Sequence, residues 1–206
     1  MGVAVLGVTV ASNAETVDFR GEEAGVPPKG WLLTMTGKRV PKWTVERDNS
    51  DQFKVLKQSG KATYPLELRQ GTSIKDGFVE ASFKPIAGSE DRAGGLVWRA
   101  IDANNYYVVR ANALEDNVVL YKTVNGARSS LEILGRKGGC GVKVAVPANQ
   151  WHTLRVDFAG TRFQVTFDGK SLFEVNDATF AEAGMVGVWT KADSVTALRD
   201  FSYDAK

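Results

Sequence analysis

The stretch that decides the fold class is Gly77-Phe78-Val79-Glu80-Ala81-Ser82-Phe83-Lys84-Pro85. Its apolar residues Val79, Ala81 and Phe83 alternate with polar ones, so an extended chain here has one apolar and one polar face. Such a strand is typical of an antiparallel sheet that packs one face on a core and leaves the other to solvent. The stretch therefore predicts a β-rich protein.

Further strands are predicted on the carboxyl side of this stretch. Short connections rich in Asp, Asn and Ala separate them, which favours antiparallel pairing of neighbours. Asn125-Gly126 has the composition of a two-residue hairpin turn. The predicted strands are Arg92–Ile101, Asn104–Asn112, Asn117–Val124 and Ala127–Leu134.

A second meander is predicted from Trp151 to Val175, with turns at Ala159-Gly160 and Asp168-Gly169. Val195–Tyr203 is predicted to be the last strand, and Val17–Phe19 is expected to pair near it. Two sheets with one apolar face each must cover one another. We therefore expect an all-β, two-sheet antiparallel sandwich in one domain, residues 15–206.

One short helix is expected at Asp177–Ala183, where Asp177 provides an amino-terminal cap and Gly184 a stop signal.

Composition excludes several classes of protein. The 206 residues carry 26 basic and 24 acidic side chains without a basic cluster, which argues against nucleic-acid binding. No apolar run approaches the roughly 20 residues of a transmembrane helix. One cysteine and one histidine allow neither an internal disulfide nor a multi-histidine metal site. The oligomeric state is left open.

Residues 1–14 carry no charge, Val3–Val10 is almost wholly apolar, and Ser12-Asn13-Ala14 has the small-x-small pattern of a signal-peptide cleavage site. We interpret residues 1–14 as the remnant of a signal peptide, which predicts a secreted or periplasmic protein. The alternative is that Val3–Val10 forms an edge strand.

Three parts of the chain resemble concanavalin A-like jelly rolls, the superfamily of lectins, glucanases and laminin G-like domains. Gly77–Pro85 is similar to the G-x-x-E-A-x-x-K-P strand of family-16 glycoside hydrolases. Trp151–Val156 and Phe167–Lys170 resemble the W-H-x-L-R-V … D-G hairpins of laminin G-like domains, and Gly184–Tyr203 resembles their closing strands. The resemblance implies a jelly-roll sandwich.

Two further segments, Gly94–Arg99 and Asn105–Arg110, look most like bacterial exported domains of the 3-keto-disaccharide hydrolase type. Glycosidases of the superfamily need two carboxylates that flank the scissile bond. The one near match to their E-x-D-x-x-E pattern, Glu46–Asp51, ends in Asp and contains the turn-forming Asp48-Asn49-Ser50. We interpret it as a solvated turn, so no catalytic pair is identified and an enzyme function stays open.

Candidate sugar-binding residues lie on the polar face predicted for the central strands, where guanidinium and amide groups can bind hydroxyls. The alternative is an ordinary solvated face. Trp189 and Lys191 are out of phase with Val186 and Val188, so the indole either stacks on a sugar ring or is covered by a neighbouring segment. The candidates are Arg99, Arg110, Asn112, Lys122, Trp189 and Lys191.

His152 shares a phase with the apolar Leu154 and is interpreted as a packed, hydrogen-bonded histidine. The resemblance also implies a structural calcium ion near the chain ends, for which Asp18 and Asp200 are the candidate ligands.

These observations predict an exported jelly-roll protein that binds an oligo- or polysaccharide on a concave sheet face. The alternatives are an enzyme of the 3-keto-disaccharide hydrolase type and a laminin G-like protein-interaction domain.

Overall fold

The computed structural model describes residues 14–48 and 53–206. The predicted signal segment, apart from Ala14, and the end of the Glu46–Asp51 motif lie outside these residues.

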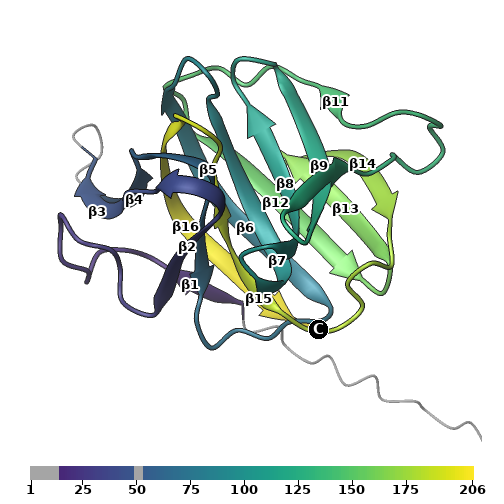
Figure 1. Ribbon diagram of the computed structural model, residues 1–206, viewed down its shortest axis with the longest axis horizontal. Coiled ribbons are helices and arrows are strands. Elements are labelled where there is room, and N and C mark those ends of the chain that lie inside the picture. The colour runs from purple at the N-terminus through teal and green to yellow at the C-terminus, as the bar shows by residue number, and fades with distance from the viewer. Residues whose placement is uncertain (1–13, 49–52) are drawn as a thin grey trace, which may run out of the picture.

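The chain folds into two antiparallel sheets that pack face to face as a sandwich (Figure 1). Sheet A has the order β14 (Lys170–Asn176), β13 (Arg162–Phe167), β12 (His152–Ala159), β6 (Gly77–Ala87), β16 (Val195–Ala205), β4 (Lys54–Gln58) and β3 (Trp43–Arg47), with β1 (Glu15–Val17) paired to β16. Sheet B has the order β10 (Ala127–Ser130), β9 (Asn117–Val124), β8 (Asn105–Asn112), β7 (Ala93–Asp102), β15 (Met185–Trp189), β5 (Lys61–Arg69) and β2 (Trp31–Val40), with β11 (Val142–Lys143) paired to β9. The predicted all-β antiparallel sandwich is confirmed.

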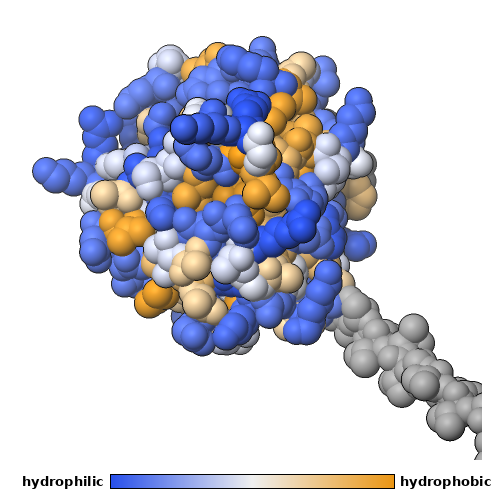
Figure 2. Space-filling view, turned by 90° about the vertical axis from the view of Figure 1, so that its right-hand side faces the viewer, coloured by the Kyte–Doolittle hydropathy of each residue, from blue (hydrophilic) through white to orange (hydrophobic). Residues whose placement is uncertain are grey.

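The core lies between the sheets and is built from alternate residues of each strand. Trp98 and Tyr107 from sheet B stack at 5.4 Å, and the Trp98 ring lies 6.0 Å from Phe158 and 5.4 Å from Phe163 of sheet A. All four side chains are buried. Hydrophilic residues cover most of the side of the molecule in Figure 2, and apolar residues show between them in a central region and in smaller patches toward the left.

Local turn chemistry agrees with the predicted connections. Asn125 and Gly126 have φ values of 50° and 80°, which are those of a type I′ hairpin between β9 and β10. The amino-terminal segment pairs with the last strand as expected, but through Glu15–Val17, opposite Tyr203 to Phe201, and not through Val17–Phe19.

The prediction of a helix at Asp177–Ala183 is wrong, because this segment is a loop. Asp177 accepts the N–H of Thr179, as a cap would. The next N–H, that of Phe180, is instead donated to the hydroxyl of Tyr107 at 3.0 Å. This tertiary bond and the packing of Phe180 in the core replace the helical pattern. Among the described residues there is no helix that could cross a membrane.

Sheet B is strongly curled. Arg128 of β10 and Tyr64 of β5 stand five strands apart in the sheet, which in a flat sheet would be about 24 Å at the usual strand spacing. The Cζ atom of Arg128 nevertheless lies 4.7 Å from the ring centroid of Tyr64. The outer face of sheet B must therefore be concave.

Candidate functional site

The concave face of sheet B has an apolar floor that is separate from the sandwich core. Across this floor, Gly95 pairs with Trp189 on one side and with Arg110 on the other. A Cβ atom on Gly95 would lie 3.3 Å from the Trp189 ring and 3.2 Å from Cβ of Arg110. Only backbone therefore separates the indole from the guanidinium, and strand glycines often mark such sites of close approach. The buried floor residues are Leu66, Leu68, Ala93, Val97, Ala100, Tyr106, Val108 and Trp189.

Three aromatic rings surround Arg128, and we call these four residues the Arg128 cluster. Cζ of Arg128 lies 4.3 Å from the Tyr121 ring centroid, 4.7 Å from Tyr64 and 5.4 Å from Trp189. Tyr64 also stacks on Trp189 at 5.4 Å. Nη1 of Arg128 is buried without a hydrogen-bond partner, which is costly for a charged donor.

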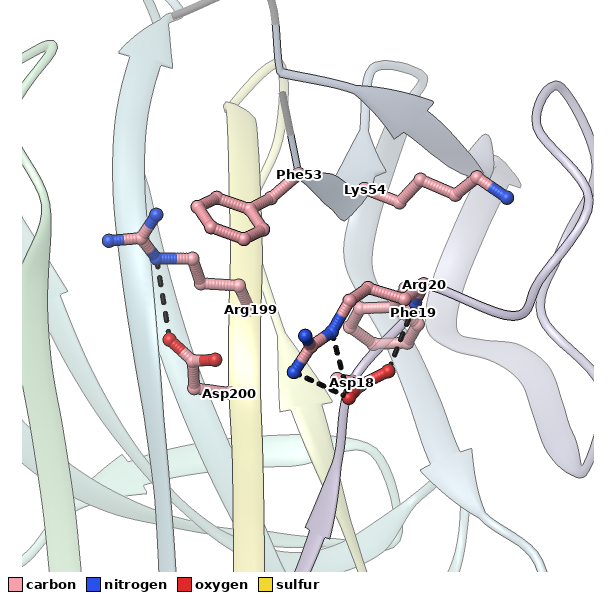
Figure 3. Close-up of a pocket in the computed structure, with 7 residues that line it drawn as sticks. All are labelled: Asp18, Phe19, Arg20, Phe53, Lys54, Arg199 and Asp200. Carbon is pink, nitrogen blue, oxygen red and sulfur yellow. Dashed lines mark hydrogen bonds and ion pairs between the residues drawn. The ribbon is translucent and has the colours of Figure 1, made fainter. Parts of the chain in front are cut away.

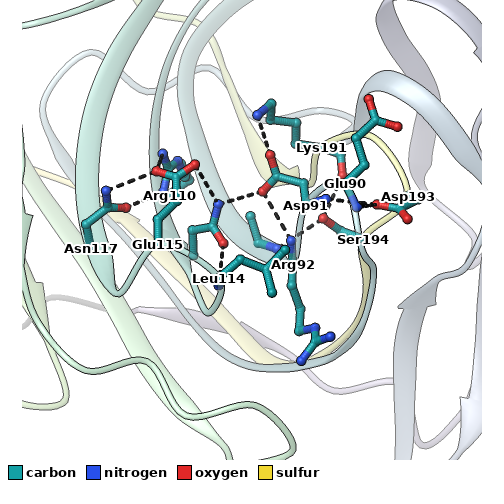
Figure 4. A network of polar contacts seen from close by, with 12 residues as sticks. Glu90, Asp91, Arg92, Arg110, Leu114, Glu115, Asn117, Lys191, Asp193 and Ser194 are labelled. Atoms are coloured by element: carbon teal, nitrogen blue, oxygen red, sulfur yellow. Dashed lines mark hydrogen bonds and ion pairs between the residues drawn. The ribbon is translucent and has the colours of Figure 1, made fainter.

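A polar network stands beside this cluster, and we call it the Arg110 network (Figure 4). Arg110 is 4% exposed in its side chain and donates to Glu115 at 2.7 Å, to Asn117 at 2.5 Å and to the Tyr121 hydroxyl at 3.1 Å. Its Nε is buried without a partner. The guanidinium is therefore fixed by the protein and keeps one donor unused.

The network continues through Asn112 to a second carboxylate. Nδ2 of Asn112 donates to Asp91 at 2.7 Å and to Glu115 at 3.1 Å. Lys191 forms an ion pair with the other oxygen of Asp91. Two carboxylates, an amide and two cations thus meet on one face, and the Glu115 side chain remains 43% exposed.

Glu115 stays ionised in this setting. Partial burial alone would raise the pKa of its carboxyl, but the hydrogen bond and charge of Arg110 outweigh burial and the net pKa is lowered. The carboxylate is therefore an acceptor for hydroxyl groups at neutral pH and has no proton to give.

Asp193 holds the loop that carries Asp91. Its carboxylate accepts the backbone N–H groups of Ser89, Glu90 and Asp91 at 2.9–3.0 Å. Burial would raise the pKa of Asp193, but these hydrogen bonds lower it well below its ordinary value.

The structure brings together four of the predicted binding residues. Arg110, Asn112 and Lys191 belong to the Arg110 network, and Trp189 forms part of the neighbouring floor. Trp189 is fully buried, since Arg128 and Tyr64 pack on its ring. Of the two interpretations of the sequence, the one in which a neighbouring segment covers the indole therefore applies.

The expectation that Arg99 and Lys122 share this face is wrong. Arg99 has a φ of 47° at an irregularity in β7, which turns its guanidinium toward Phe158 and Phe163 of the core. There it donates to the backbone carbonyls of residues 75, 160 and 180. Lys122 lies opposite Tyr107, on the core side of β9, and binds Asp177 at 2.8 Å. Neither points to the concave face.

The two predicted calcium ligands, Asp18 and Asp200, line one pocket of about 400 Å³ (Figure 3). Asp18 is bound by Arg20 at 3.0 Å, and Asp200 lies 3.4 Å from Arg199. Among the described residues, no three Asp, Glu, His or Cys side chains are grouped to hold a metal ion. Two neighbouring guanidiniums fit a divalent cation poorly, and calcium binding stays a prediction for titration.

The interpretation of His152 is confirmed. The side chain is buried, and its ring nitrogens lie 2.9 Å from an Asp168 carboxylate oxygen and 2.9 Å from the Pro147 carbonyl. Glu46 and Asp48 of the glucanase-like motif form ion pairs with Lys57 and Lys84 on sheet A, away from the concave face.

Sequence reasoning missed five residues of the site: Tyr64, Asp91, Glu115, Tyr121 and Arg128. Asp91 and Glu115 lie in turns, where alternation gives no information. Arg128 could have been found, because the Asn-Gly turn fixes its register opposite Thr123. Tyr121 lies on the concave side of β9, because its neighbour Lys122 is the residue on the core side.

Comparison with known proteins gives one curated relative. The chain is 26% identical over 162 residues to levanase of Bacillus subtilis (strain 168), an alignment that covers 77% of this chain and 20% of levanase. The chain thus spans one fifth of that relative's length. No protein-family model matches the sequence.

Solved structures agree on the architecture. The carbohydrate binding module CBM66 from Bacillus subtilis superimposes with a TM-score of 0.69 at 20% identity, over 89% of this chain and 99% of the module. A Bacillus licheniformis beta-glucanase gives a TM-score of 0.58 at 13% identity, over 96% and 99%. The fold is a concanavalin A-like jelly roll. The laminin G-like and 3-keto-disaccharide hydrolase resemblances stay predictions.

Proposed function

We propose that this protein binds a carbohydrate on the concave face of sheet B. The observation that carries the proposal is the position of the Arg110 network directly beside the Arg128 cluster. The network supplies fixed donors and acceptors, and the cluster supplies aromatic surface. Sugars offer the matching combination of hydroxyl groups and apolar C–H faces.

The hydroxyl contacts are assigned to groups that the protein already holds in place. The exposed Glu115 carboxylate accepts hydroxyl protons, while the partly exposed guanidinium of Arg128 donates to sugar oxygens. Since the side chains are held by neighbours, little rotamer entropy is lost on binding. Tyr64 and Tyr121, both half-buried, present their rings to the ligand.

Binding without cleavage is the favoured activity. Hydrolysis by paired carboxylates needs one of them protonated to donate to the leaving oxygen. The lowered pKa of Glu115 opposes that role.

The likeness to levanase makes levan the first polysaccharide to test. Calorimetric titration of the full chain with levan oligosaccharides, and with inulin and β-glucan oligosaccharides beside them, measures affinity directly. Glu115→Gln should weaken binding at least tenfold. Glu182→Gln is the matched control, because its carboxylate is 86% exposed in a loop outside the site, and it should bind like the wild type.

Absence of binding to every sugar tested, or equal affinity of Glu115→Gln and wild type, would contradict the proposal. Release of shorter sugars from levan, or cleavage of a 3-keto-disaccharide, would replace it with the enzyme alternative.

Export to the periplasm or outside the cell belongs to this proposal, supported by the signal-like residues 1–14. Mass spectrometry of the protein isolated from the organism that makes it should find a mature chain that begins at Glu15. An uncleaved cytoplasmic product would contradict export.

A further inference from the structure

A pocket of about 400 Å³ lies on sheet A, the sheet opposite the concave face (Figure 3). It is formed where the turn after β1 meets β16 and the start of β4. Its volume is at the small end of the roughly 300–1,000 Å³ of ligand pockets, which suits one or two sugar rings.

A β-bulge creates the floor of this pocket. Leu198 and Phe201 of β16 both point into the core although they are three positions apart in the sequence. In a regular strand, residues on the same face are an even number of positions apart. The pairing of β16 with β6 shifts at this point, and Asp200 has a φ of 51°. Arg199 and Asp200, although consecutive, therefore line the same pocket. Bulges often serve to re-aim side chains next to functional sites.

Two arginine–carboxylate pairs face the pocket. Arg20 binds Asp18 through Nε at 3.1 Å and Nη2 at 3.0 Å, and Nε of Arg199 lies 3.4 Å from Asp200. The Arg199 guanidinium also stacks on the Trp151 ring, with Cζ 4.2 Å from the centroid. Each pair places donors beside an acceptor, an arrangement that matches two neighbouring hydroxyl groups.

Phe53 forms the apolar wall. Its side chain is 48% exposed and extends over the pocket above the two ion pairs. The Lys54 ammonium points away from the pocket and donates to the Glu22 carbonyl. The two guanidiniums and two carboxylates that remain cancel in charge, which favours a neutral polyhydroxyl ligand over an anion or a metal ion.

We propose that this pocket is a second carbohydrate site, for one or two neutral sugar rings, formed by Phe53 and the ion pairs Asp18–Arg20 and Arg199–Asp200. The ligand's C–H face packs on the phenyl ring, and vicinal hydroxyls bridge each arginine and carboxylate. With the concave face, it makes the protein bivalent toward a polysaccharide, which raises avidity without any new contact.

The test is a ¹⁵N chemical-shift titration of the full chain with trisaccharides of levan, cellulose, xylan and mannan. At least one probe should shift the amides of residues 18–20, 53 and 199–200. Phe53→Ala should weaken that binding at least tenfold. Ile101→Ala, which truncates an exposed apolar side chain outside the pocket, should leave it unchanged.

The Glu115→Gln variant separates the two proposals. Shifts in the pocket that persist in Glu115→Gln support an independent second site, even if the concave face binds nothing. No pocket shifts with any probe, equal affinity of Phe53→Ala and wild type, or pocket shifts that vanish in Glu115→Gln would each overturn the second site.

Discussion

Glu67 provides a sharp test of the packing of sheet B. It lies between Leu66 and Leu68, whose side chains face the concave floor, so its own carboxyl points into the sandwich core. The residue is fully buried, and neither carboxylate oxygen has a hydrogen-bond partner. Burial raises its pKa from 4.5 to about 8.

The sign of the pH dependence follows from this shift. Below pH 4.5 the carboxyl is protonated in both folded and unfolded chains and has no effect. Between pH 4.5 and 8 only the unfolded chain ionises, so the free energy of unfolding falls as the pH rises. At about 1.4 kcal/mol per pH unit, flattening near the folded pKa, the total loss is about 4 kcal/mol.

Glu67→Gln removes the titration while keeping a similar shape. We expect the difference in unfolding free energy between variant and wild type to move by about 4 kcal/mol in favour of the variant from pH 4.5 to pH 8. Urea denaturation at several pH values measures it, and the difference cancels the titration of groups common to both proteins. A ¹³C titration of the Glu67 carboxyl gives its folded pKa directly. A pH-independent difference, or a folded pKa below 6, would refute the reasoning.

Three further changes have defined outcomes. Asp193→Ala removes the acceptor that holds the loop of Asp91, so sugar affinity should fall severalfold in calorimetry. In the wild type, the lowered pKa of Asp193 keeps its carboxylate ionised through pH 4, so the loop should loosen only at lower pH. Gly126→Ala places a side chain at a φ of 80° and should lower the free energy of unfolding by about 1 kcal/mol, as measured by urea titration. Unchanged stability would contradict this expectation. Tyr107→Phe removes the hydroxyl that donates to Asp177 and accepts the backbone N–H of Phe180. This variant should have a lower melting temperature and faster amide exchange in residues 177–183. Unaltered exchange would contradict the role given to this hydroxyl.

The fold was predictable because a period of two is a property of the chain itself. In Gly77–Pro85 and the neighbouring strands, the alternation of apolar residues shows which face packs on the core. Asn125-Gly126 is a residue pair that favours the positive φ values of its turn. The prediction of a helix at Asp177–Ala183 was wrong because the Tyr107 hydroxyl, 70 residues before Asp177 in the sequence, bonds to Asp177 and to the backbone N–H of Phe180. A local sequence pattern does not show this tertiary contact.

The site was predictable only in part, because alternation breaks at irregular positions. Arg99 changes face at a residue with positive φ, and Arg199 and Asp200 share a face at a bulge. Asp91 and Glu115 reach Asn112 from turns. The curl of sheet B brings Arg128 of β10 against Tyr64 of β5, which stands five strands away in the sheet. This curl depends on contacts between distant parts of the chain, so a local sequence pattern does not predict it.

The most direct test of the account is a crystal structure of the protein soaked with a levan oligosaccharide. The account predicts sugar density on the outer face of sheet B, with hydroxyls within hydrogen-bond distance of Glu115 and Arg128 and a ring against Tyr121 or Tyr64. Sugar bound only away from that face, or an unaltered concave face at saturating ligand, would contradict it.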